Sequence, residues 1–359
     1  MTVLLFVLGF GFLVGGAEAL VRGASKLAAA FGLSPLVIGL TVVAFGTSAP
    51  ELAVSVHAAI VGQADLALGN VVGSNICNVL LILGAAALVA PLAIAAQIVR
   101  FDVWVVITVS VGLLLLALDG RIGRFDGLLF VAGGVVYTGW LIHQARKKKP
   151  AQGVDHDREA PAPPSAPKAT WPRDVGLVIV GLVLLVLGAR WLVNGAVAFA
   201  RVMGVSELIV GLTIVALGTS LPELATSVIA SLRGERDIAV GNVIGSNIFN
   251  ILVVLGSAAA ISPDGVRVAH TALVFDIPVM VVVAIACLPI LFTDYRIDRW
   301  EGALFLACYV AYVVYLVLDA TRSGALAWYR MGLLGFALPL TAYAIIVSVL
   351  HSLRRRRTH

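Results

Sequence analysis

Residues 46–51 read Gly-Thr-Ser-Ala-Pro-Glu and interrupt an apolar segment that runs from about residue 34 to residue 61. Proline removes one backbone N–H from a helix and clashes with the carbonyl four residues earlier, so the carbonyls from Ala44 to Gly46 are expected to lose helical partners. A carboxylate in a membrane-length helix costs about 3 kcal/mol on insertion scales. Because Pro50 and Glu51 are both unfavourable in such a segment, we interpret the stretch as a helix broken for a functional reason. Its carbonyl, hydroxyl and carboxylate oxygens are the ligands that hard cations prefer.

The same stretch occurs a second time. Residues 218–223 read Gly-Thr-Ser-Leu-Pro-Glu, 172 positions after the first copy. When residues 34–84 are aligned with residues 206–256 without a gap, about 30 of the 51 pairs are identical. The shared core is GLTxVAxGTSxPELA followed by GNVxGSNIxN. The chain therefore contains an internal duplication.

The composition is that of a polytopic membrane protein. Of the 359 residues, 60% are hydrophobic and 13% are charged, and the mean hydropathy is +1.03, which is too apolar for a soluble domain. The formal net charge of +5 comes from basic residues in short loops and at the C-terminus, so it indicates membrane orientation and not a nucleic-acid partner. The three cysteines lie in apolar runs and offer neither a disulfide framework nor a CxxC metal site.

Apolar windows of membrane-spanning length predict the architecture. Five windows fall in the first half, near residues 2–21, 34–61, 65–90, 100–118 and 125–144, and five in the second, near residues 174–194, 206–232, 238–260, 271–293 and 300–319. An eleventh, near 329–350, has no counterpart. Because each half has an odd number of spans, the second copy enters the membrane from the opposite side. We predict an all-α polytopic membrane protein with two inverted five-helix repeats and one extra C-terminal transmembrane helix.

The domain boundaries follow from these windows and from the composition between them. Residues 1–144 and 173–319 are the two repeats, residues 145–172 form a disordered, basic and proline-rich cytoplasmic linker, and residues 320–359 hold the extra helix and a basic cytoplasmic tail. Most Lys and Arg residues, including those at 146–149 and 354–357, fall on one side of the membrane when the N-terminus is outside. We therefore expect a multi-pass cell-membrane protein with its N-terminus outside and its C-terminus in the cytoplasm.

Each repeat offers two polar helix faces. Thr47 and Glu51 are four residues apart, as are Ser74 and Asn78, and this spacing puts each pair on one face of a helix. The second repeat carries the same pairs, and neighbouring glycines allow the helices to approach closely. We expect four polar faces to meet near the middle of the membrane. There Glu51 and Glu223 would balance the charge of one Ca²⁺, with hydroxyls, carbonyls and water as further ligands, or the same oxygens would hold several Na⁺.

The paired GTSxPE and GSNIxN segments resemble the two alpha-repeats of the sodium/calcium exchanger family, within the cation/calcium antiporter superfamily. The resemblance covers about residues 1–319. It implies ten core helices, a central site between the second, third, seventh and eighth, and alternating access by movement of the first and sixth. The ion-binding residues that it implies are Thr47, Ser48, Glu51, Ser74, Asn78 and the carbonyl of Ala44 in the first repeat, and Thr219, Ser220, Glu223, Ser246, Asn250 and the carbonyl of Ala216 in the second. Many relatives, including the potassium-dependent branch, carry an aspartate where this chain has Asn250, so co-transport of K⁺ is not expected.

The sequence is compatible with two transport functions. The first is exchange of Ca²⁺ for Na⁺, which the hydroxyls of Thr47 and Ser48 and their counterparts favour, and the second is exchange of a divalent cation for protons carried by the same carboxylates. An intramembrane hydrolase is not favoured, because we expect no plausible paired base near Ser48 or Ser220, and an inverted duplication around buried acids does not favour a passive channel. The expected partners are the transported Ca²⁺ and Na⁺ and the lipid bilayer. No cofactor and no enzymatic activity are expected, and nothing in the sequence indicates an oligomeric state.

Overall fold

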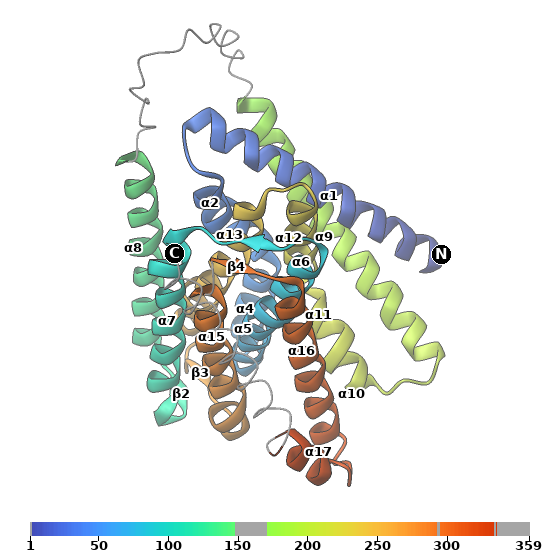
Figure 1. The fold of residues 1–359 in the computed structure, drawn as a ribbon. Helices are drawn as coiled ribbons and strands as arrows, with labels where there is room; N and C mark the ends of the chain where they lie inside the picture. The colour runs from blue at the N-terminus through green and yellow to red at the C-terminus, as the bar shows by residue number, and fades with distance from the viewer. Residues whose placement is uncertain (1, 148–170, 293–294, 334, 336–359) are drawn as a thin grey trace, which may run out of the picture.

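The computed structural model describes residues 2–147, 171–292, 295–333 and 335. Figure 1 shows an upright bundle of helices, with two long helices, α1 (Thr2–Phe31) and α9 (Trp171–Val202), lying obliquely across one side of it. The other elements of the first half are α2 (Pro35–Ile38), η1 (Gly39–Val43), α3 (Ala44–Thr47), α4 (Ala49–Ile60), α5 (Asp65–Cys77), η2 (Asn78–Leu83), α6 (Gly84–Val89), β1 (Leu92–Ala93), η3 (Ile98–Asp102), α7 (Val103–Leu116), η4 (Ala117–Asp119), β2 (Arg121–Ile122) and α8 (Arg124–Lys147).

The second half repeats this order of elements. After α9 come α10 (Glu207–Val210), η5 (Gly211–Val215), α11 (Ala216–Gly218), α12 (Leu221–Leu232), α13 (Arg236–Phe249), η6 (Asn250–Leu255), α14 (Gly256–Ile261), β3 (Val266–Arg267), η7 (Ala272–Asp276), α15 (Ile277–Phe292), β4 (Arg296–Ile297), α16 (Arg299–Ala320) and α17 (Leu326–Gly332). The segments η1, η2 and η3 are π-helical, and η5, η6 and η7 are π-helical at the matching positions. Such turns are frequent at functional sites.

The spans agree with the predicted windows. In the described part of the chain, seven helices are long and apolar enough to cross a membrane, and the bent pair Pro35–Thr47 and Ala49–Ile60 forms an eighth span. Two shorter apolar helices, Leu221–Leu232 and Ala272–Leu288, complete the ten windows of the two halves. The predicted all-α, polytopic membrane fold is confirmed. Most of the predicted linker and most of the eleventh window, residues 329–350, lie outside the described residues.

The core is built from the third span of each half. In the span formed by α13, η6 and α14, 94% of the most apolar stretch is buried, and in the matching span formed by α5, η2 and α6 the value is 78%. The other five long spans are 39% buried or less. A helix that is apolar or small on all sides is expected at the centre of a bundle. The segments that carry the repeated GSNIxN sequence therefore lie at the centre of the molecule.

Helices α1 and α9 pack against each other through glycines. Gly9 and Gly16 lie seven residues apart on α1, and Gly181 and Gly188 have the same spacing on α9. A Cβ at Gly16 would lie 2.8 Å from the carbonyl oxygen of Gly181, and one at Gly188 would lie 2.7 Å from that of Gly9. The two backbones therefore touch without side chains between them, as in small-residue packing of membrane helices.

Polar contacts tie α1 to the second half. The carboxylate of Glu18 pairs with Arg22, 2.5 Å away on the same helix, and with Arg233 at the end of α12. Two turns after Glu18 on α1, the hydroxyl of Ser25 donates to the carboxylate of Glu235 over 2.7 Å. These contacts hold one end of α1 on the turn between α12 and α13.

Two short strand pairs join the halves. β1 pairs with β4 antiparallel, with Leu92 opposite Ile297, and β2 pairs with β3, with Arg121 opposite Arg267. The pairs lie at opposite ends of the bundle (Figure 1). Each pair contains one strand from each half, so the core spans of the two halves are fastened to each other at both ends.

Candidate ion-binding site

Both copies of the repeated stretch break a helix, as predicted. Pro50 lies in the first turn of α4, and the span bends by 44° at Ser48 between α3 and α4. In the second copy α11 ends at Gly218, and α12 begins at Leu221 with Pro222 in its first turn. Proline is tolerated in a first turn, because the N–H that it lacks has no helical partner there. Each break therefore starts a new helix directly before the repeated glutamate.

The two glutamates of the repeats are linked across the molecule. Glu51 and Glu223 are each 1% exposed and lie in the first turns of α4 and α12, where the positive end of the helix dipole favours a carboxylate. The hydroxyl of Ser48 donates to Oε1 of Glu223 over 3.1 Å, and that of Ser220 donates to Oε1 of Glu51 over 3.3 Å. The Oγ atom of Ser220 also lies 3.2 Å from the Oγ atom of Ser74. Each glutamate is therefore held by the other half of the chain.

Four asparagines from α5, α13 and the start of η2 and η6 form a second link. The amide nitrogen of Asn78 donates to Oδ1 of Asn247 over 2.9 Å, and that of Asn250 donates to Oδ1 of Asn75 over 3.0 Å. All four side chains are buried. Because the predicted ligands Asn78 and Asn250 use their N–H groups in these bonds, their carbonyl oxygens are left to face other groups.

The glutamates, serines and asparagines that link the two halves form one buried junction. Some oxygen atoms of this junction, from both halves, have no hydrogen-bond partner. Among the described residues, five of its buried side-chain oxygens have no hydrogen-bond partner, and these are Oε2 of Glu51 and Glu223, Oδ1 of Asn78 and Asn250, and Oγ of Ser246. A buried polar atom without a partner costs free energy, and each of these atoms has a lone pair to offer. Nowhere in the described part of the chain do three or more His, Cys, Asp or Glu side chains gather as a metal site. A cation at the junction would therefore be held by two carboxylates and neutral oxygens, which suits a hard ion.

A supporting layer lies behind the glutamates. The amide nitrogen of Asn70 donates to Oγ of Ser55 over 3.0 Å and to the carbonyl oxygen of Glu51 over 3.3 Å. In the second half Asn242 makes the matching bonds, over 3.0 Å to Ser227 and 3.4 Å to the carbonyl of Glu223. The sequence interpretation missed both serines. The signal was present, because each serine follows its glutamate by four residues in both copies.

The predicted threonine ligands connect this layer to the opposite half. The hydroxyl of Thr47 donates to Oδ1 of Asn242 over 3.0 Å, and that of Thr219 donates to Oδ1 of Asn70 over 3.4 Å. A hydroxyl that donates its hydrogen still has lone pairs for a cation. Both threonines therefore lie beside the glutamates with oxygen available.

The expectation of free carbonyls before the proline is wrong for Ala44. Its carbonyl oxygen accepts the N–H of Ser48 over 3.0 Å, because α3 continues to the bend despite the proline two residues later. In the second copy the N–H of Ser220 is donated instead to the carbonyl of Leu217 over 3.2 Å. The two copies therefore differ in how the carbonyls of Ala44 and Ala216 are used, and a ligand role for either carbonyl stays a prediction.

The two halves also differ in packing. Val43 is 0% exposed, whereas its counterpart Val215 is 48% exposed. A Cβ at Gly245 on α13 would lie 2.8 Å from the carbonyl oxygen of Leu40 on η1, whereas a Cβ at the matching Gly73 on α5 would meet no atom within 4 Å. Segment α2–η1–α3 therefore packs tightly on α13, while α10–η5–α11 packs more loosely on α5. The junction is covered more closely on one side than on the other.

Fold and site together define a class: a multi-pass membrane carrier whose duplicated halves enclose an oxygen-lined junction with two buried acids. A family model described as sodium/calcium exchanger protein matches residues 1–143 and 174–318. The chain therefore belongs to the sodium/calcium exchanger family, and it is a cation/calcium antiporter.

Individual relatives are similar over most of their length. A putative antiporter CaxA of Alkalimonas amylolytica is 42% identical over 313 residues, which cover 86% of this chain and 96% of the relative. The sodium/calcium exchanger MaX1 of Methanosarcina acetivorans is 34% identical over 343 residues, which cover 87% of this chain and 97% of the relative. A solved structure of the sodium-calcium exchanger NCX_Mj, soaked with zero Na⁺ and Ca²⁺, matches with a TM-score of 0.74 at 29% identity, over 88% of this chain and 98% of that chain.

Proposed function

We propose that this protein exchanges Na⁺ for Ca²⁺ across the cell membrane by alternating access. The proposed ion ligands are side-chain oxygens of Thr47, Ser48, Glu51, Ser74, Asn78, Thr219, Ser220, Glu223, Ser246 and Asn250, with the carbonyls of Ala44 and Ala216. The observation that carries the proposal is the set of unpartnered buried oxygens shared by the two halves. The name of the relative MaX1, a sodium/calcium exchanger, agrees with it.

The chemistry of exchange follows from the two carboxylates. Glu51 and Glu223 together neutralise one Ca²⁺. When Ca²⁺ leaves, Na⁺ ions neutralise the same carboxylates, so the protein avoids an uncompensated buried charge. Ca²⁺ and Na⁺ therefore compete for one set of oxygens and cannot be bound fully at the same time. This competition couples the movement of one ion to that of the other.

The proposed orientation places the N-terminus outside and the C-terminus in the cytoplasm, with residues 1–144 and 173–319 as inverted repeats, 145–172 as a cytoplasmic linker and 320–359 as an added helix and tail. In this orientation the tightly packed α2–η1–α3 lies on the cytoplasmic side, and the more exposed α10–η5–α11 lies outside. We assign the structure to a state that opens to the outside. Movement of α1 and α9 along their glycine contacts would change the open side.

A second candidate is exchange of a divalent cation for protons on the same carboxylates. One observation favours it: each glutamate already accepts a hydroxyl hydrogen from the other half, so a carboxyl proton could replace a cation there without leaving a charge. The neutral Asn250, in place of an aspartate, leaves one acid fewer to carry protons and argues for Na⁺.

The test is ⁴⁵Ca²⁺ uptake into proteoliposomes loaded with NaCl and diluted into sodium-free choline medium, with and without a protonophore. Uptake that needs internal Na⁺ and survives the protonophore is the expected result. Uptake that ignores Na⁺ and follows an imposed pH gradient would establish the proton-coupled alternative. As a control for substitutions of Glu51 and Glu223, Asp119→Asn removes an acid in η4, beyond the end of α7, and should transport as the wild type does.

A further inference from the structure

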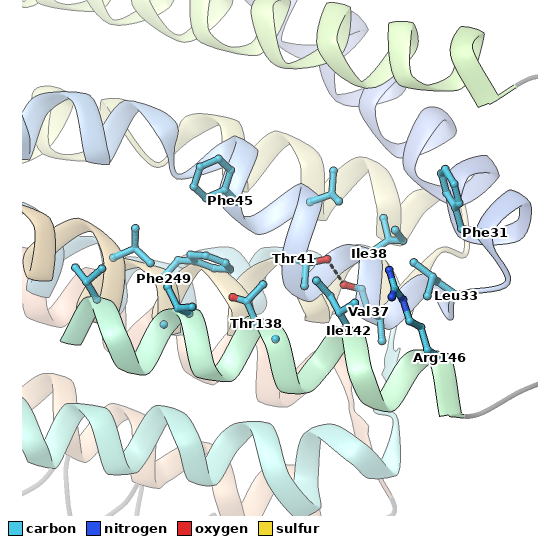
Figure 2. Close-up of a pocket in the computed structure, with 16 residues that line it drawn as sticks. Phe31, Leu33, Val37, Ile38, Thr41, Phe45, Thr138, Ile142, Arg146 and Phe249 are labelled. Carbon is cyan, nitrogen blue, oxygen red and sulfur yellow. Dashed lines mark hydrogen bonds between the residues drawn. The ribbon is translucent and has the colours of Figure 1, made fainter. Parts of the chain in front are cut away.

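A groove of about 750 Å³ lies between α8 and the segment α2–η1–α3. Figure 2 shows Arg146, Phe31 and Leu33 at one end, Thr138 and Ile142 along α8, and Phe45 with Phe249 at the other end. Its volume is typical of a ligand site. The groove is separate from the ion junction, because none of the proposed ligands lines it.

Two glycines of α8 line the groove. A Cβ at Gly139 would meet no atom within 4 Å, so a side chain there would project into open space. A Cβ at Gly134 would lie 3.1 Å from Cγ2 of Val253, another lining residue, so this glycine lets α8 pack closely there. The absence of a side chain at Gly139 therefore leaves part of the groove open.

The lining favours an apolar occupant. Eleven of the sixteen lining residues are aliphatic or aromatic, and the others are two threonines, two glycines and Arg146. Several of the apolar side chains are exposed, including Val42 at 39%, Phe45 at 52% and Val135 at 69%. These residues belong to helices that span the membrane, so the exposed side chains face lipid and not water. A hydrocarbon chain fits these surfaces, and a polar ligand does not.

One end of the groove carries a cation. Arg146 is exposed in the last turn of α8, and none of the ion pairs found between described residues includes it. Lys147 follows it, and the sequence continues with Lys148 and Lys149. A basic end on an apolar groove at the edge of a membrane span matches a lipid with an anionic headgroup.

We propose that this groove binds one acyl chain of an anionic phospholipid, whose phosphate is held by Arg146. This lipid would lie in the cytoplasmic leaflet, and only that assignment depends on the proposed orientation of the chain. At the inner end the rings of Phe45 and Phe249 meet edge to face with centroids 5.8 Å apart. Phe45 follows Ala44 and Phe249 precedes Asn250, so the bound chain ends one residue behind the proposed ion site. The lipid would support α2–η1–α3 in its packed position on α13.

The test is native mass spectrometry of the full-length protein, delipidated and then supplied with phosphatidylglycerol or with phosphatidylcholine of the same chains. The wild type should retain phosphatidylglycerol about fivefold better, which is the effect of one basic residue near a membrane surface. Arg146→Gln should abolish this preference, and the neighbouring Lys147→Gln should keep it. Gly139→Leu should reduce retention of both lipids by filling the groove, whereas Gly112→Leu on α7, which also has open space around it, should not.

Several results would overturn the proposal. Equal retention of the two lipids by the wild type would mean that only unspecific surface lipid is present. A preference that survives Arg146→Gln would place the headgroup elsewhere. Retention unchanged by Gly139→Leu would mean that the groove is not the site, and a concentration-dependent dimer lost in this variant would assign the groove to a second copy of the chain. Each variant is first required to give a monodisperse protein with the thermal stability of its control, so a loss of folding is not read as a loss of lipid.

Discussion

Gly245→Ala would place a methyl group 2.7 Å from Cβ of Ala44 and 2.8 Å from the carbonyl oxygen of Leu40. At the matching position of the other half, Gly73→Ala would meet no atom within 4 Å. If the repeats are inverted, the state open to the opposite side exchanges these two environments. The first substitution should therefore disfavour the conformation described above, and the second should disfavour the opposite one.

The size of the effect follows from the overlap. Forcing an extra carbon into a well-packed contact costs about 1–3 kcal/mol, which corresponds to about a 5- to 150-fold shift in the equilibrium between the two states. Exchange of glycine for alanine inside a helix also gains about 1 kcal/mol in helix propensity. This gain is the same in both states, so it cancels in their ratio.

Hydrogen–deuterium exchange can measure the shift on two matched segments, residues 39–47 and 211–219. In the wild type we expect residues 211–219 to exchange faster, because they are less well packed. Gly245→Ala should slow exchange in 211–219 and raise it in 39–47, and Gly73→Ala should widen the wild-type difference. Changes in the same direction for the two variants would refute the argument from inverted packing.

Three further outcomes are expected. Glu51→Gln and Glu223→Gln should each lower the apparent Ca²⁺ affinity in ⁴⁵Ca²⁺ uptake by more than about 100-fold, because loss of a residue that only hydrogen-bonds to a metal ligand already costs 10- to 100-fold. Uptake like that of the wild type in either variant would show that the substituted glutamate is not an ion ligand. Ser227→Ala should cost about tenfold in affinity without loss of folding, since it frees the asparagine that braces the second glutamate, and an unchanged affinity would make the serine merely structural. Glu18→Arg should speed hydrogen–deuterium exchange in the segment that follows α1, because it releases α1 from Arg233. Adding Arg233→Glu should restore the slower rate. No recovery in the double variant would show that the ion pair is not responsible.

The sequence contained the main features of the fold. Pro50 and its counterpart predict two broken helices, and a gap-free repeat predicts two halves with the same element order; both are found. The exchange of hydrogen bonds between the glutamates and the serines of opposite halves was not predictable in detail. Residue spacing defines which side chains share a helix face, but it does not say which face of another helix they meet.

Other features depend on packing that a linear pattern does not encode. The π-helical segments follow neither from composition nor from spacing, because an extra residue in one turn leaves no visible phase shift in segments as uniformly apolar as η2 and η6. Helix α1 reaches Phe31, well beyond the predicted window near residue 21, since its last turns are held by contacts such as Ser25 with Glu235. Ser55 was overlooked because serine in a membrane helix is common, and its role appears only beside Asn70.

The strand pairs have a consequence for how the protein is made. β1 and β2 leave the ribosome long before β4 and β3, so the first half must insert into the membrane with these strands unpaired. An unpaired strand edge invites pairing with other chains. Each of these strands is only two residues long, too short to recruit a foreign partner with any strength. The short strands therefore limit pairing with other chains until the second half of the protein has been synthesised.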